Sequence, residues 1–134
     1  MKLAAIDIGS NAARLLIDEV FQSPQGKTEF VKVSLVPVPL RLGFDVFEKG
    51  EISKEREDNM IKTLLTYKLL LEVYDVKYLK ACATSAMRDA KNSQQILERV
   101  KRETGIDLKI ISGQEEASYI YENHVADYMN KEET

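Results

Sequence analysis

The sequence has few of the residues that build metal centres and disulfide frameworks. Its 134 residues include one cysteine, Cys82, and one histidine, His124. One cysteine permits no internal disulfide, and one cysteine with one histidine cannot complete the four-ligand set of a structural zinc site. The composition therefore excludes a zinc finger and a disulfide-rich secreted scaffold. A reducing, cytoplasmic location is expected.

Long apolar runs and an excess of positive charge are also missing. The opening apolar stretch stops at Asp7, and no run approaches the roughly 20 apolar residues that a membrane helix needs. The net charge is −3, whereas broad binding to a nucleic-acid backbone needs many clustered Lys and Arg side chains. We therefore expect no membrane segment and no nucleic-acid partner, and any phosphate site must be local.

What the sequence does contain is the pattern of an α/β domain. Strands are predicted at 3–6, 15–21, 30–40, 76–83 and 108–111, and helices at 53–74, at 93–104 and from a capping box at 112–115. The order β-β-β-α-β-α-β-α predicts a mixed five-stranded sheet with three antiparallel strands first and parallel strands later. Pro37 and Pro39 cannot donate to a strand ladder, so the third strand should end there or lie at the sheet edge.

The first candidate site is the turn Asp7-Ile8-Gly9-Ser10-Asn11, which follows the first predicted strand. Gly9 allows a close backbone approach, and Ser10 and Asn11 can donate hydrogen bonds to phosphate oxygens. Asp7 can orient a Mg²⁺ ion or its water beside the anion. The turn thus predicts a phosphate cradle, which is not a P-loop because G-x-x-x-x-G-K is absent. An ordinary hairpin turn uses the same residue types and is the alternative.

The second candidate is Arg88, in a segment that follows the strand predicted at 76–83. Open α/β sheets bind ligands at the carboxyl ends of their strands. A guanidinium there can hold two phosphate oxygens and stabilise charge during phosphoryl transfer. A surface ion pair between Arg88 and Asp89 is the alternative.

The third candidate is Glu116, at the next strand-to-helix junction. Its neighbour Glu115 completes the capping box with Ser112. Glu116 points about 100° away around the helix and has no capping role, so it can accept a proton from water. The alternative is a solvated acid that interacts with the positive end of the helix. His124 lies on the apolar stripe of this helix and is assigned no role.

Four segments resemble the N-terminal domain of the exopolyphosphatase and guanosine pentaphosphate phosphatase (Ppx/GppA) family. They lie at 5–11, 42–43, 83–90 and 111–117 and together span nearly the whole chain. The resemblance implies an actin-like ATPase (ribonuclease H-like) fold, in which two related domains enclose a phosphate-bearing ligand. It also implies hydrolysis of the terminal phosphate of inorganic polyphosphate or guanosine pentaphosphate, with Mg²⁺ as cofactor.

The resemblance also implies a role for each candidate residue. Asp7 to Asn11 match the family's first phosphate loop, in which Gly9, Ser10 and Asn11 would hold phosphate. Arg88 matches the family's phosphate-binding arginine, and Glu116 matches the general base that activates water. Our leading hypothesis adds Mg²⁺ near Asp7. The sequence departs from the family at residues 12 and 13, where two alanines stand. The family's second phosphate loop, D-x-G-G-G-S, is absent, because no two of the six glycines are adjacent.

We therefore interpret residues 1–134 as the N-terminal domain of a two-domain hydrolase, inactive without its second domain. Two alternatives have different chemistry: a non-catalytic module that binds polyphosphate or an alarmone, and a phosphotransferase similar to acetate or sugar kinases. The sequence does not distinguish polyphosphate from guanosine pentaphosphate as the substrate. It also leaves open whether the chain forms a homodimer through its apolar interdomain face.

Overall fold

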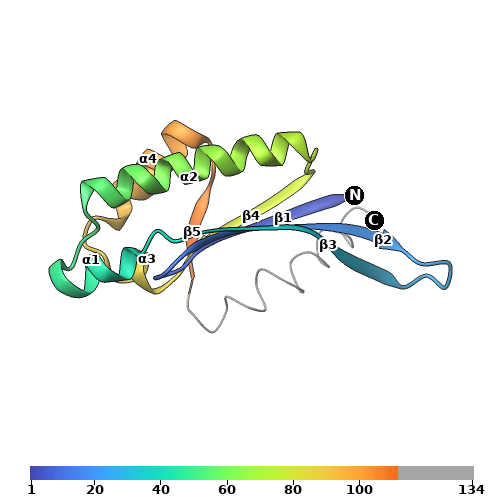
Figure 1. Cartoon of the computed structure of the whole chain (residues 1–134), viewed down its shortest axis with the longest axis horizontal. Coiled ribbons are helices and arrows are strands. Elements are labelled where there is room, and N and C mark those ends of the chain that lie inside the picture. Colours follow the sequence, from blue (N-terminus) through green and yellow to red (C-terminus); the bar gives the residue numbers. More distant parts are fainter. Residues whose placement is uncertain (112–134) are drawn as a thin grey trace.

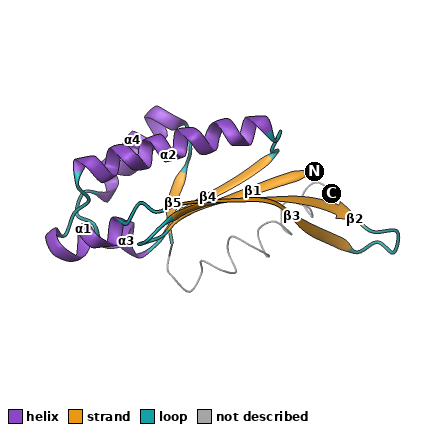
Figure 2. Cartoon of the chain, viewed as in Figure 1, coloured by secondary structure: helices purple, strands orange, loops and turns teal. Residues whose placement is uncertain are grey.

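The computed structural model describes residues 1–111, which form a five-stranded sheet with four helices (Figure 1). The strands are β1 (Lys2–Ile8), β2 (Ala13–Gln22), β3 (Thr28–Val38), β4 (Tyr78–Ala83) and β5 (Leu108–Ile110), and the helices are α1 (Leu42–Lys49), α2 (Lys54–Val73), α3 (Ser85–Asp89) and α4 (Ser93–Thr104). Helices α2 and α4 form a layer over one face of the sheet (Figure 2).

The sheet is mixed, as the sequence predicts. Its strand order is β3-β2-β1-β4-β5, with β1, β2 and β3 antiparallel and with β4 parallel to both β1 and β5. The predicted edge position of the third strand is confirmed within the described residues. Because β3 pairs on one side with β2 and has no described strand on the other, it can include Pro37 without breaking a central ladder.

The main core lies between the sheet and the helices. Alternate residues of β1 and β2, including Ile6, Ile8 and Leu15, are fully buried and belong to the same apolar cluster as Leu64 and Tyr67 of α2. The Tyr67 hydroxyl donates a hydrogen bond of 2.7 Å to the carbonyl oxygen of Val36 in β3. This bond ties the long helix to the edge strand.

Helix α2 begins where the sequence predicts a helix. The hydroxyl oxygen of Ser53 accepts a hydrogen bond of 3.3 Å from the backbone amide of Arg56. It thereby satisfies one of the amide groups that a helix start leaves without an intrahelical partner. The predicted N-cap is confirmed.

The predicted element order lacks two helices that the structure contains. Helix α1 contains Gly43, has no side-chain cap and begins after Arg41, whose φ is a left-handed 56°. Helix α3 has five residues and likewise has no side-chain cap. Both are short helices held by tertiary contacts, which local sequence patterns do not report. The helix predicted after β5, with Glu116 and His124, lies outside the described residues.

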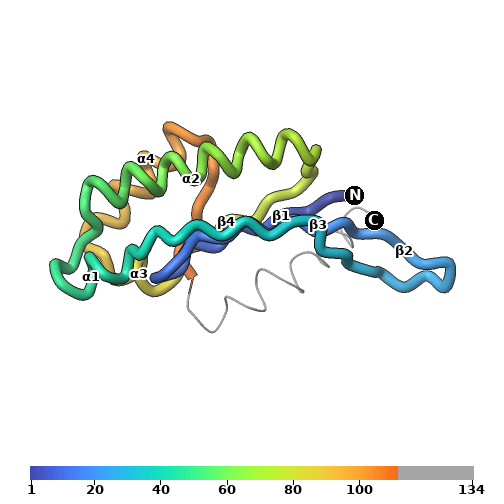
Figure 3. Tube along the Cα trace, in the orientation of Figure 1, coloured from blue at the N-terminus to red at the C-terminus, as the bar shows by residue number. Residues whose placement is uncertain are grey.

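The two ends of the sheet differ. At one end the β2–β3 hairpin projects beyond the other strands (Figure 3). Its turn is closed by hydrogen bonds from Ser23 to Lys27 and from Gly26 to Ser23. At the other end β1 and β4 terminate beside α1 and α3 (Figure 1). The predicted residues Gly9, Ser10 and Asn11 follow β1 there, and Arg88 lies on α3. In residues 1–111, each helix is too short or too polar to cross a membrane.

Candidate active site

The carboxyl ends of β1, β4 and β5 meet at one edge of the sheet. Ile8 is paired with Ala83, and the amide of Thr84 donates to the carbonyl of Ile8 at 3.1 Å. The amide of Ile111 donates to the carbonyl of Ala83 at 2.9 Å. The segments that follow the three strands therefore leave the sheet at the same edge, which is where open α/β sheets bind ligands.

The loop of residues 9–12 is braced through its carbonyl groups. Gly43 donates its amide to the carbonyl of Ser10, and Arg41 donates to that of Asn11, each at 2.9 Å. The Ser10 hydroxyl shares a hydrogen bond of 2.5 Å with the hydroxyl of Ser85. The start of α1 and the start of α3 thus fix the loop from two sides.

Two amide groups of the same loop have no acceptor among the described residues. Gly9 donates its amide to the carbonyl of Ala12 at 2.9 Å. In the described part of the chain, no hydrogen bond is donated by the backbone amides of Ser10 and Asn11. Two successive amides without a described partner at a strand end are donors that an anion can use.

A hollow of about 450 Å³ lies over this loop. It is lined by Gly9, Ser10, Asn11, Ala12, Arg14, Thr84 and Ser85. The structure therefore brings the predicted loop residues Gly9, Ser10 and Asn11 together with Ser85 and Arg14, two residues that the sequence interpretation did not select. A larger hollow of about 600 Å³, lined by Met1 and Tyr78 among others, lies at the other end of the sheet. It contains none of the candidate residues.

Asp7 is buried beneath the loop. Arg14 donates a hydrogen bond of 2.6 Å to its Oδ2 atom, and the Arg14 side chain is half-exposed toward the hollow. The Oδ1 atom of Asp7 is buried and has no hydrogen-bond partner among the described residues. A buried carboxylate oxygen without a partner is costly, and a cation with its water shell would satisfy it.

Residues 1–111 contain no cluster of three His, Cys, Asp or Glu side chains that could hold a metal ion. A Mg²⁺ ion does not need such a cluster, since it is commonly bound by one or two carboxylates, water and substrate phosphates. Asp7 fits that mode of binding.

Arg88 lies on α3, close to the edge but outside the lining of the hollow. Its side chain is 46% exposed, and its Nε atom lies 3.8 Å from Oδ1 of Asp89. This weak surface pair is the alternative that the sequence left open. Glu116, the predicted general base, lies outside the described residues, which end at the same sheet edge with Ile111.

Of the two residues that the sequence interpretation did not select, Arg14 could have been found from the register of the β1–β2 hairpin. In the β1–β2 hairpin, Asp7 is paired with Arg14, so both side chains point to the same face of the sheet. Counting outward from the turn would have identified this ion pair. Ser85 gives no comparable signal, because its contact with Ser10 joins residues that are 75 positions apart.

Comparisons with known proteins agree with this geometry. The profile of the Ppx/GppA phosphatase family matches residues 20–134. The crystal structure of the Ppx/GppA family member from Aquifex aeolicus is similar, with a TM-score of 0.78 and 37% identity, over 89% of this chain and 37% of that one. This similarity confirms the predicted actin-like α/β fold.

Two curated relatives have names that state an activity. Exopolyphosphatase 1 of Mycobacterium tuberculosis is 32% identical over 87% of this chain and 33% of its own length. The guanosine-5'-triphosphate,3'-diphosphate pyrophosphatase of Vibrio vulnificus is 29% identical over 88% of this chain and 23% of its own. The chain thus spans a third or less of these relatives. Since the family profile covers most of its residues, the chain belongs to the Ppx/GppA phosphatase family.

Proposed function

We propose that the intact protein hydrolyses the terminal phosphoanhydride bond of inorganic polyphosphate or of guanosine pentaphosphate. The observation that supports this is the braced 9–12 loop, whose Ser10 and Asn11 amides have no other partner in the described residues. Family membership and the names of the mycobacterial and Vibrio relatives support the choice of substrates.

In this proposal the loop binds the terminal phosphate. The amides of Ser10 and Asn11 donate to its oxygens, because a rigid loop can present them without reorganisation. The exposed Arg88 side chain exchanges its weak contact with Asp89 for a phosphate oxygen, which it can hold more strongly. Binding then depends on positioning and on neutralising charge.

Glu116 is the proposed general base. It takes a proton from a water molecule, and the water oxygen forms a bond to the terminal phosphorus. The bond from that phosphorus to the bridging oxygen breaks, and the bridging oxygen keeps the bonding electrons. The products are inorganic phosphate and a substrate that is one phosphate shorter.

Asp7 is the proposed protein ligand for Mg²⁺, either directly or through water. The buried Oδ1 atom without a described partner supports this assignment. When bound, Mg²⁺ would offset the negative charge of the substrate phosphates. Arg14 holds the other oxygen and fixes the orientation of the carboxylate.

We further propose that residues 1–134 alone release no phosphate. The described part of the chain offers the 9–12 loop, the Asp7 carboxylate and the Arg88 guanidinium to a ligand with several charged phosphates. The triple-glycine loop of the second domain would supply the remaining contacts. Robust phosphate release by the isolated 134-residue chain would overturn this proposal.

The decisive experiment measures phosphate release by the intact protein from both substrates with Mg²⁺. We expect Glu116→Gln to abolish release while ligand binding persists, since the amide cannot accept the proton from water. Glu115→Gln is the matched control, because Glu115 is predicted to cap the helix and a Gln can also do so. Binding of either substrate without release by the wild-type protein would favour a sensory module instead.

A further inference from the structure

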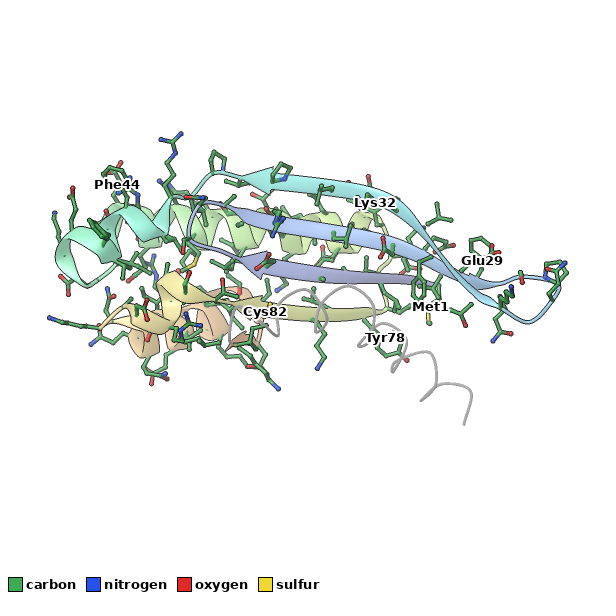
Figure 4. The ribbon with its side chains drawn as sticks, turned by 90° about the horizontal axis from the view of Figure 1, so that it is seen from below. Met1, Glu29, Lys32, Phe44, Tyr78 and Cys82 are labelled. Atoms are coloured by element: carbon green, nitrogen blue, oxygen red, sulfur yellow. The ribbon has the colours of Figure 1, made fainter. Side chains whose placement is uncertain are left out.

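Helix α1 presents two exposed aromatic side chains beside the 9–12 loop. Phe47 is 92% exposed and Phe44 is 64% exposed. Figure 4 shows Phe44 at the end of the molecule opposite Glu29 and Met1, which is the end where the loop lies. Two exposed phenylalanines next to a ligand-binding loop suggest a surface for a flat apolar group.

A second hollow joins these aromatic residues to the loop. It measures about 500 Å³ and is lined by Ser10, Asn11, Gly43, Phe44, Phe47 and Glu48. That volume is within the range of small-molecule sites. Because Ser10 and Asn11 also line the hollow over the loop, one ligand could occupy both hollows.

The aromatic face is held at a fixed distance from the loop. The start of α1 is bonded to Ser10 through Gly43, and its C-cap Gly50 accepts a hydrogen bond of 2.9 Å from Lys91. Asp45 joins α1 to the start of α2 by accepting from Ser53 and Arg56. Phe47 lies about one helical turn, roughly 6 Å, along the helix from Gly43. A ligand bound at the loop can therefore reach it.

Phe44, Phe47 and Glu48 occupy one side of the helix, because they are three and four positions apart. The guanidinium carbon of Arg56 lies 6.0 Å from the centre of the Phe44 ring and supports that ring. Glu48 is exposed and provides a carboxylate next to the rings. The site thus combines a stacking surface with an acceptor of hydrogen bonds.

This combination is complementary to guanine. The Watson–Crick edge of guanine carries two neighbouring donors, N1–H and the N2 amino group, which a carboxylate can accept together. Adenine has an acceptor at N1 and no amino group at C2. Aromatic side chains stack on every base, so the rings would give affinity and the carboxylate would give selectivity.

We propose that α1 forms a guanine-binding site, in which the base stacks on Phe47 and Phe44 and donates hydrogen bonds to Glu48. The inference rests on the proposed function and narrows it, because guanosine pentaphosphate has a base to place there and polyphosphate does not. The terminal phosphate would lie at the 9–12 loop, with the ribose and the other 5'-phosphates spanning the distance to α1.

The test compares kcat/KM of the intact protein on guanosine pentaphosphate, its adenosine counterpart and polyphosphate. We expect Phe47→Ala to raise KM for guanosine pentaphosphate about tenfold, a typical effect of losing one stacked aromatic, and to leave KM for polyphosphate unchanged. Glu48→Gln should reduce the preference for guanosine over adenosine. Phe21→Ala, which removes a 42% exposed ring far from the loop, is the control.

An equal effect of Phe47→Ala on guanosine pentaphosphate and polyphosphate would overturn the inference and indicate that the rings pack against the rest of the protein. No effect on either substrate would overturn it as well. Calorimetry of guanosine pentaphosphate binding separates the proposed hydrolase function from the proposed guanine site. If the wild-type protein binds guanosine pentaphosphate without hydrolysing it, and Phe47→Ala abolishes that binding, the hydrolase function is rejected and the guanine site is retained.

Discussion

The backbone of Gly43 is in direct contact with Ser10. Its amide donates to the Ser10 carbonyl at 2.9 Å, and a Cβ atom added to Gly43 would lie 2.9 Å from the Cβ of Ser10. Real Cβ atoms do not approach each other that closely. The contact between α1 and the 9–12 loop therefore requires glycine at position 43. The glycine of the Leu42-Gly43 segment thus has a structural role at the candidate site.

Gly43→Ala should therefore disturb the site and the fold together. We expect the added methyl group to displace the loop, to lower the free energy of unfolding by about 1–3 kcal/mol and to raise KM for both substrates. Chemical denaturation and phosphate release would measure the two effects.

Gly26→Ala is the control for this prediction. Gly26 has a φ of 81° and no atom within 4 Å of an added Cβ, and it lies in the distant β2–β3 turn. Its substitution should lower stability through backbone strain while KM stays unchanged. If Gly43→Ala raised KM no more than Gly26→Ala does, the brace would not control the loop.

Asp7→Asn tests the proposed Mg²⁺ ligand. An amide keeps the shape of the carboxylate but binds Mg²⁺ weakly, so the Mg²⁺ concentration for half-maximal activity should rise about 10- to 100-fold. Titration of phosphate release with Mg²⁺ would show this shift. Asp89→Asn changes an exposed carboxylate near the same edge and should leave the titration unchanged. An unchanged titration in Asp7→Asn would remove Asp7 from the metal site.

Arg88→Ala distinguishes a phosphate ligand from a surface ion pair. If Arg88 stabilises the transferring phosphoryl group, its loss should reduce kcat by about 100-fold or more, as losing a transition-state donor does in other enzymes. Asp89→Ala breaks the same surface pair from the other side and should change kcat little. Equal, small effects of the two substitutions would identify the pair as structural.

Features set by neighbouring residues could be predicted from the sequence, whereas features set by contacts between distant segments could not. The β1 run that stops at Asp7, the N-cap Ser53 and the edge position of Pro37 are each visible within a few residues, and the structure confirms the strand, the cap and the edge. The brace of Gly43 on Ser10 joins two distant segments. No local pattern reports such a contact, so α1 and its role could not be predicted.

The ion pair of Asp45 with Arg56 makes the attachment of α1 sensitive to acid. Burial disfavours the charged form of Asp45, but hydrogen bonds from Ser53 and the charge of Arg56 together outweigh it and lower the pKa of Asp45 below its ordinary value of 3.8. The folded state therefore prefers the charged carboxylate. Its stabilising contribution is present above pH 3.8 and is lost as the pH falls through the lower folded pKa.

Asp45→Asn should accordingly destabilise the 134-residue chain at neutral pH by about 1–2 kcal/mol, since the charge-assisted bond to Arg56 is lost while the amide oxygen still accepts from Ser53. The difference from wild type should shrink as the pH falls below 3.8. Urea unfolding at several pH values would measure it, with Asp75→Asn as the exposed control. A pH-independent difference would show that the side chain acts through packing. A difference that disappears in acid would show that its charge holds α1 to the start of α2, and thereby positions the aromatic residues beside the loop.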